Sequence, residues 1–180
     1  MQAVLDADFI NKIDEIKSTD TKQLFRKLMK ELNCTPVVHP YVMSHELFSC
    51  NLAQDMIEEG LLRSVDYKEF LPDDKREGYE QRFRDLYWDM TFEESGQGIE
   101  AHDNIFIRHA GCSYGEVHSV LMAAELGIPV FYSNDHSGKT LCNHFRNLES
   151  KTIHEICEEY KGKDGSIITA KEWKYLCHST

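Results

Sequence analysis

Residues 114–135 read YGEVHSVLMAAELGIPVFYSND and contain two elements with clear ends. Apolar side chains recur at helical spacing in the first half of this stretch, which predicts a helix. Gly127 follows as a helix terminator, and Pro129 stands just beyond it. The apolar run at residues 128–132 then predicts a buried strand. It ends in three polar residues, Ser133, Asn134 and Asp135.

Two earlier apolar runs, at residues 3–5 and 35–38, also have the character of short buried strands. Segments with helical spacing lie between them, and Pro40 is placed to begin a helix that ends near Gly60. Strand, helix and strand therefore alternate along the chain. We expect an α/β protein with three layers, α/β/α, and a central sheet of mostly parallel strands.

The length of 180 residues suits one compact domain. We expect the sheet and its helices to occupy residues 1–149. Residues 150–180 are expected to add a C-terminal helical extension packed on the same domain. A capping box formed by Thr169 and Glu172 predicts the start of its last helix.

Composition narrows the class of protein. The net charge is −11, whereas nucleic-acid binders are usually basic, so the charge counts against a nucleic-acid partner. No apolar run is long enough to span a membrane, and the first residues do not resemble a signal peptide. Six cysteines include no CxxC pair. We therefore expect reduced thiols, a cytoplasmic protein and no membrane partner.

Four carboxylates stand at positions that converge on one crevice in such a fold. Asp6 and Asp135 come just past the ends of predicted strands, where open α/β sheets bind ligands. Glu116 lies in the first turn of the helix before the second of these strands, and Glu46 lies on the helix that follows residues 35–38. Four such charges would repel one another unless cations were present. Oxygen ligands alone favour Mg²⁺ or Mn²⁺.

Each carboxylate also has a plainer interpretation. Glu46 alone would be an ordinary surface residue, and Glu116 a charge favoured by the helix dipole. Three histidines, at positions 45, 118 and 136, lie close in sequence to these carboxylates, but their spacing fits no zinc motif. Cys112 or Cys142 could pair with a histidine as a nucleophile, but no sequence motif supports such a pair.

Four segments together resemble the PIN-domain family of ribonucleases. LDADFINKI at residues 5–13 is similar to the opening of these domains, and SHELF at residues 44–48 to their glutamate-bearing helix. Residues 114–135 resemble the closing pattern, which SNDHSGKTL at residues 133–141 continues. The resemblance covers residues 2–146, loosely in the middle. The stretch between Glu46 and Glu116 is longer than in compact PIN toxins.

The resemblance implies a nuclease that hydrolyses phosphodiester bonds of RNA with Mg²⁺ or Mn²⁺. Asp6, Glu116 and Asp135 would be ligands, and Glu46 a ligand or the residue that holds the attacking water. Ser133 and Asn134 would orient Asp135 and the end of the strand. Asp8 competes with Asp6 for the role of first ligand; we prefer Asp6 because it ends the strand, and expect Asp8 to cap the helix.

Many members of this family are toxins, so an antitoxin or other protein partner and a homodimer are further expectations. A binding module without catalysis, in which the crevice takes a metal or a protein partner, is the alternative. The four carboxylates favour catalysis, whereas the net charge of −11 favours binding.

Overall fold

A computed structural model describes residues 1–94, 104–107 and 113–178 of the chain, with the side chains of residues 91–94 left out. Its centre is a sheet of five strands in the order β3-β2-β1-β4-β5, and every neighbouring pair is parallel. The strands are β1 (Gln2–Leu5), β2 (Thr35–Val38), β3 (Arg63–Ser64), β4 (Val130–Tyr132) and β5 (Glu149–Lys151). The expected parallel sheet is confirmed.

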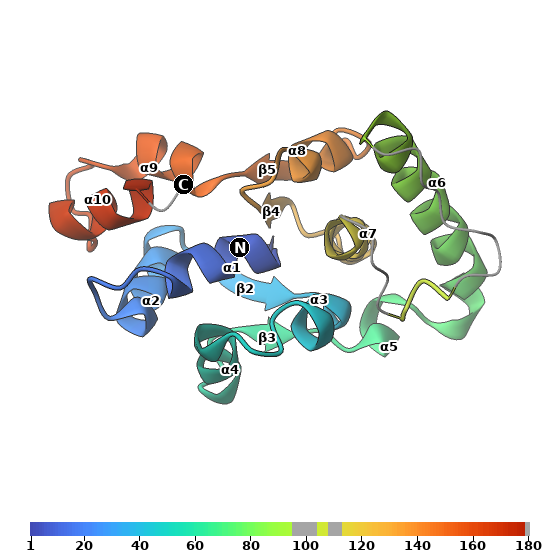
Figure 1. Ribbon diagram of the computed structural model, residues 1–180, viewed down its shortest axis with the longest axis horizontal. Coiled ribbons are helices and arrows are strands. Elements are labelled where there is room, and N and C mark those ends of the chain that lie inside the picture. Colours follow the sequence, from blue (N-terminus) through green and yellow to red (C-terminus); the bar gives the residue numbers. More distant parts are fainter. Residues whose placement is uncertain (95–103, 108–112, 179–180) are drawn as a thin grey trace.

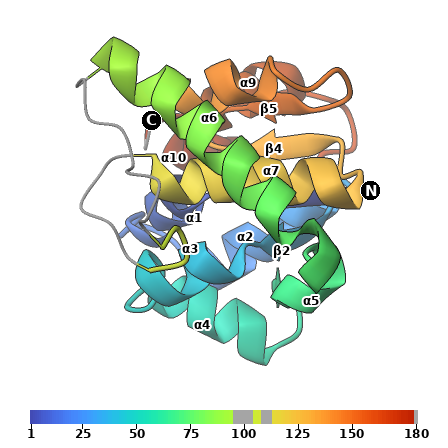
Figure 2. The ribbon, with the colours of Figure 1, turned by 90° about the vertical axis from the view of Figure 1, so that its right-hand side faces the viewer.

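Helices cover both faces of this sheet (Figure 1). One face carries α1 (Ala7–Asp14), α2 (Thr21–Glu31), α4 (Asn51–Glu58), α9 (Ile153–Tyr160) and α10 (Ala170–His178). The other carries α3 (Pro40–His45), α5 (Tyr67–Phe70), α6 (Arg76–Glu94), α7 (Tyr114–Leu126) and α8 (His136–Cys142), with the 3-10 turn η1 (Asp73–Lys75) before α6. Viewed from this side, α6 lies outside α7 (Figure 2). The three-layer α/β/α architecture is therefore as expected.

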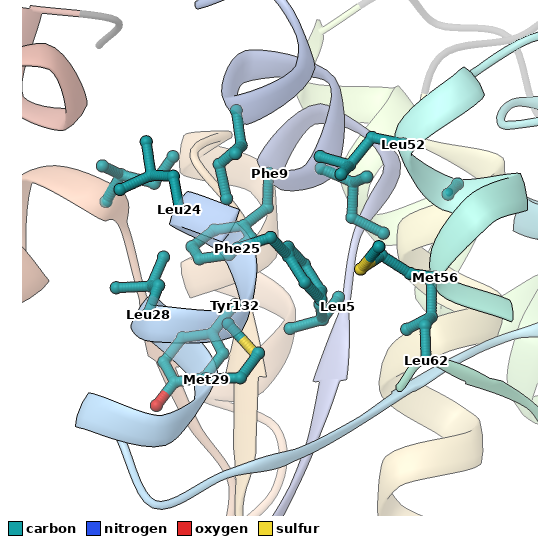
Figure 3. Packing of buried hydrophobic residues seen from close by; sticks show 14 of the residues in the cluster. Leu5, Phe9, Leu24, Phe25, Leu28, Met29, Leu52, Met56, Leu62 and Tyr132 are labelled. Atoms are coloured by element: carbon teal, nitrogen blue, oxygen red, sulfur yellow. The ribbon is translucent and has the colours of Figure 1, made fainter. Parts of the chain in front are cut away.

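Alternation along the strands builds two cores, because successive strand side chains point to opposite faces. In β1, Leu5 enters the core under α1 and α2, whereas Val4 enters the core under α7. In β4, Tyr132 and Phe131 divide in the same way. Figure 3 shows Leu5 and Tyr132 packed against side chains of α1, α2 and α4.

The chain between Pro40 and Gly60 differs from the single helix expected there. It forms α3 and α4, which are separated by residues 46–50. The backbone N–H groups of Glu46 and Leu47 both donate to the carbonyl oxygen of Val42, each over 2.9 Å, which ends α3. Leu47 is fully buried there. The break leaves Glu46 at the end of α3 rather than inside a longer helix.

The C-terminal residues belong to the sheet as well as to a helical layer. The expected boundary between residues 149 and 150 falls inside β5, which pairs with β4. Beyond it, Ile156 of α9 and Trp173 of α10 are buried in the same core as α2. Lys27 of α2 also forms an ion pair of 2.7 Å with Glu172. The described part of this segment, residues 150–178, is thus joined to the rest of the fold by strand pairing, burial and an ion pair.

Candidate metal centre

The strand order reverses between β1 and β4, and a cavity of about 340 Å³ opens beyond the ends of these two strands. Its lining includes all four carboxylates expected from the sequence, Asp6, Glu46, Glu116 and Asp135. The other lining residues are Ala7, Asp8, Asn11, Ser113 and Gly115. We call this cavity the acidic crevice. Its location at a reversal of strand order is where parallel sheets of this kind bind ligands.

Asp6 forms the buried floor of the acidic crevice. It follows β1 directly, and its N–H donates to the carbonyl oxygen of Tyr132 over 3.0 Å. Its Oδ2 accepts a hydrogen bond of 3.1 Å from the Ser133 hydroxyl, whereas its buried Oδ1 has no hydrogen-bond partner in the described part of the chain. Burial, and then the charge of Glu116, raise the pKa of Asp6 well above its usual range.

Asp8 does not cap α1, contrary to expectation. The residue at the N-cap is Asp6, and Asp8 lies in the first turn of the helix. The Asp8 carboxylate instead accepts a 3.0 Å hydrogen bond from the backbone N–H of Asn134, because α1 begins beside the end of β4. Burial is the main cause that raises the pKa of Asp8. Asp8 therefore links α1 to the end of β4 at the acidic crevice.

Glu116 is the second buried carboxylate, with 6% of its surface exposed. It lies in the first turn of α7, and its Oε1 accepts a hydrogen bond from the hydroxyl of Ser137. Burial raises its pKa to about 7, and the charges of Asp135 and Asp8 act in the same direction. A carboxyl group in this environment takes up a proton readily near neutral pH when no cation is bound.

Asp135 and Glu46 stand at the exposed rim. Asp135 caps α8: its Oδ1 accepts from the N–H of Ser137 over 3.1 Å. Glu46 comes from the opposite side, at the end of α3, and its carboxylate lies against Gly115 in the first turn of α7. The acidic crevice thus has two buried carboxylates at its floor, two exposed ones at its rim, and a fifth, the half-buried Asp8, on its wall.

Ser133 and Asn134 support this arrangement from the end of β4. The Ser133 hydroxyl donates to Asp6 and accepts from the N–H of Asp135 over 3.2 Å. The side-chain oxygen of Asn134 accepts a 2.8 Å hydrogen bond from the N–H of Ile153, which fixes the strand end to the start of α9. Both residues therefore orient carboxylates or the strand end, but Ser133 contacts the Asp6 carboxylate rather than that of Asp135.

The donor set suits a hard divalent cation, since it consists of carboxylate oxygens, and one buried oxygen has no hydrogen-bond partner among the residues that the structure describes. Within residues 1–94, 104–107 and 113–178, however, no three His, Cys, Asp or Glu side chains already stand close enough to hold an ion. Carboxylates repel one another when no cation lies between them. The residues fit Mg²⁺ or Mn²⁺ in chemical type, and binding would draw the side chains inward.

The histidines near these carboxylates have other roles. His118 is fully buried: Nδ1 lies 2.8 Å from the Tyr79 hydroxyl, and Nε2 lies 2.9 Å from the carbonyl oxygen of Ile105. The ring of His45 stacks on Tyr41. His136 is exposed at the start of α8. None of the three lines the acidic crevice.

Two cysteines, Cys112 and Cys142, were considered as possible nucleophiles. Cys112 lies outside the described residues. Cys142 is buried, and burial raises its pKa to about 12, which disfavours the thiolate that a nucleophile requires.

The sequence did not predict several groups of the acidic crevice, among them Ser137, Asn11 and Gly115. Ser137 bridges Glu116 and Asp135, Asn11 lines the wall one turn beyond Asp8, and Gly115 makes room for Glu46. A serine two residues after a strand-terminal aspartate is a usable signal, because a helix starting there turns it back toward the strand end. The other two depend on how α1, α3 and α7 pack.

Two larger cavities lie elsewhere, of about 420 Å³ beside β5 and about 360 Å³ beside α2. In the first, Lys139 pairs with Glu155 and Lys151 with Glu159. In the second, Arg26 pairs with Glu59. Size alone does not define a site, and the acidic crevice is the stronger candidate because, within the part of the chain that the structure describes, no ion pair neutralises its buried Asp6 and Glu116.

Comparison of the chain with models of known protein families, with curated proteins and with solved structures finds no match. Among the described residues, no helix has both the length and the apolar character that a membrane span requires.

Proposed function

We propose that this protein is a metal-dependent nuclease that hydrolyses phosphodiester bonds of RNA in the cytoplasm, using Mg²⁺ or Mn²⁺ in the acidic crevice. The observation that carries the proposal is the buried Oδ1 of Asp6, which has no hydrogen-bond partner among the described residues and lies on the floor of a cavity lined by four further carboxylates. Buried polar atoms are normally satisfied, so an atom left over in a charged cavity points to a ligand that completes it.

The residues of the acidic crevice have separate tasks in this proposal. Asp6, Glu116 and Asp135 hold the ion, and Glu46 at the rim holds it or orients the attacking water. The chemistry that such an ion supplies when bound is activation of water and neutralisation of charge on the phosphate. Ser133 keeps the Asp6 carboxylate in place, and Asp8 fixes α1 to the end of β4.

RNA is proposed as the substrate because of the resemblance of four segments to PIN domains. The same resemblance supports an antitoxin or another protein partner, and a homodimer. The net charge of −11 means that phosphate would approach a largely negative molecule. A bound cation is then required for the substrate to enter the crevice as well as for the chemistry.

A binding module without catalysis is the second candidate. The net charge favours it, because an acidic surface suits a basic protein partner. In that case the acidic crevice would bind the metal ion, and RNA would remain intact.

The test is cleavage of a labelled, structured RNA by purified protein in Mn²⁺. Wild type is expected to cleave, EDTA to abolish cleavage, and Asp135→Asn to reduce it by about 100-fold or more. Asp164→Asn is the matched control, since Asp164 lies in an exposed turn far along the chain. It should cleave as wild type does.

Cleavage that survives EDTA would contradict the proposal, and so would equal cleavage by wild type and Asp135→Asn. If the folded wild type binds Mn²⁺ but leaves RNA intact, the binding module replaces the nuclease as the better account.

A further inference from the structure

Gly115 is the second residue of α7 and lies directly under the carboxylate of Glu46. A Cβ atom built on Gly115 would stand 2.2 Å from Oε1 of Glu46, and 2.7 Å from both its Cδ and its Oε2. These distances are far below van der Waals contact. The Glu46 carboxylate therefore occupies the space that any other residue at position 115 would fill.

The closest atoms lie at the end of one side chain. All three of the nearest atoms belong to the Glu46 carboxylate group, and none belongs to the backbone. A larger residue at position 115 would hence move the carboxylate and leave the fold intact. Position 115 is also helical, where alanine is preferred to glycine for the stability of the helix.

Other glycines make the contrast clear. A Cβ added to Gly78 of α6 would have no atom within 4 Å, so replacement of this glycine by alanine would meet nothing. Gly138 of α8 would bring a Cβ to 3.0 Å from Phe131, a tight but smaller conflict with a packed ring. Gly115 differs from both because its neighbour is a carboxylate of the acidic crevice.

The position also favours the charge of Glu46. The first turn of α7 presents backbone N–H groups and the positive end of the helix dipole, which stabilise a nearby carboxylate. Glu46 comes from the far end of α3, so its side chain must reach across to this turn. Contact with the turn is close only where no Cβ intervenes.

We propose that Gly115 is a positioning residue, whose missing Cβ admits the Glu46 carboxylate to the acidic crevice and fixes it opposite Asp6 and Glu116. The proposal rests on the proposed function for its consequence, since Glu46 matters there as part of the metal centre. It goes beyond that function because it assigns the placement of the Glu46 carboxylate to a glycine.

The first experiment compares Gly115→Ala with wild type in Mn²⁺ affinity, measured by titration calorimetry, and in thermal stability. Affinity is expected to fall by about tenfold or more, as it does when a residue that orients a ligand is lost. The melting temperature should stay the same or rise. Gly78→Ala is the control, with the same gain in helix preference and unchanged Mn²⁺ affinity.

A double substitution tests whether Gly115 acts through Glu46. Glu46→Ala removes the three atoms that stand nearest to a Cβ at position 115, so adding Gly115→Ala should then change Mn²⁺ affinity no further. The proposal is overturned if Gly115→Ala binds Mn²⁺ as wild type does, or if its loss is equally large in the Glu46→Ala background.

A third readout separates this proposal from the proposed function. The ¹³Cδ chemical shift of Glu46 in the metal-free protein should change in Gly115→Ala and stay constant in Gly78→Ala. If wild type neither binds Mn²⁺ nor cleaves RNA, the nuclease is refuted, while a changed shift still supports the positioning of Glu46. An unchanged shift would overturn the positioning itself.

Discussion

Burial places the Glu116 carboxyl group in an environment that disfavours its negative charge. Its pKa rises from 4.5 to about 7, which corresponds to roughly 3 kcal/mol at about 1.4 kcal/mol per pKa unit. The folded protein therefore keeps a proton that the unfolded chain loses. For the metal-free protein, the contribution of Glu116 to the free energy of unfolding should therefore decrease as pH rises from about 4.5 to 7.

Urea unfolding of the metal-free protein at several pH values tests this pH dependence of the free energy of unfolding. Glu116→Gln cannot lose a proton, so the free energy of unfolding of wild type should fall relative to that of the variant over this range. Asp6 acts in the same direction as Glu116, and the buried His39 and His118 act in the opposite direction, but these groups are common to both proteins. Parallel pH profiles for wild type and Glu116→Gln would refute the assignment to Glu116.

Ser133 orients Asp6 through a buried hydrogen bond. Ser133→Ala should lower Mn²⁺ affinity by about 10- to 100-fold, because it frees a ligand to rotate. It should also cost about 1–3 kcal/mol of stability, since the N–H of Asp135 loses its acceptor. Calorimetric titration and urea unfolding give the two values.

Ser119→Ala is the control for this substitution. Ser119 is a fully buried serine on α7, and its hydroxyl has no hydrogen-bond partner in the described residues. Its replacement should leave Mn²⁺ affinity unchanged. Equal effects of the two serine substitutions would show that Ser133 acts only by filling space.

At the scale of elements, α10 attaches the C-terminal residues to the core through Trp173. This side chain is 1% exposed, and its Nε1 donates to the Ser166 hydroxyl over 3.2 Å. Trp173→Ala should cost about 3–5 kcal/mol in urea unfolding, the usual range for removing a buried aromatic side chain. Trp88→Ala on α6, where the ring is 52% exposed, should cost less than about 1 kcal/mol. Similar costs for both would mean that α10 is not part of the core.

The elements that were predicted from the sequence have local signals of their own. β1, β2 and β4 are apolar runs, and α7 ends at Gly127, whose φ of 64° suits glycine. β3 (RS) and β5 (ESK) were not predicted, because two or three polar residues at the edges of a sheet carry no apolar pattern. Only their pairing with β2 and β4 makes them strands.

The sequence likewise predicted only part of the acidic crevice. Asp6 and Asp135 were found because a strand ends beside each of them. The partners of Asp8 and Glu46 were not found, since a hydrogen bond to Asn134 and a contact with Gly115 join segments far apart in the chain. Such contacts follow from the packing of α1 and α3, which no local pattern encodes.

At the scale of the whole molecule, a second buried polar cluster will affect acid stability. His39 and His118 are fully buried, and their rings stack with centroids 4.7 Å apart. Burial lowers the pKa of His39 well below its usual range and that of His118 to about 3. Both rings are neutral in the folded state, so their contribution to stability is present above about pH 6.5 and is lost as pH falls below it.

Proton NMR of the histidine rings measures their protonation state directly. Two of the nine histidines should keep the chemical shifts of neutral rings down to pH 5, as long as the protein stays folded. Substituting His118 by Gln should remove one of these two signals. Titration of both signals with midpoints near pH 6.5 would contradict their burial.

The most direct test of the metal centre is to locate the ion itself. Crystals grown with Mn²⁺ should show an anomalous difference peak in the acidic crevice, bounded by Asp6, Glu116 and Asp135, with the Oδ1 of Asp6 among the ligands of the ion. A crevice without such a peak at saturating Mn²⁺, in crystals of the folded wild-type protein, would contradict the account.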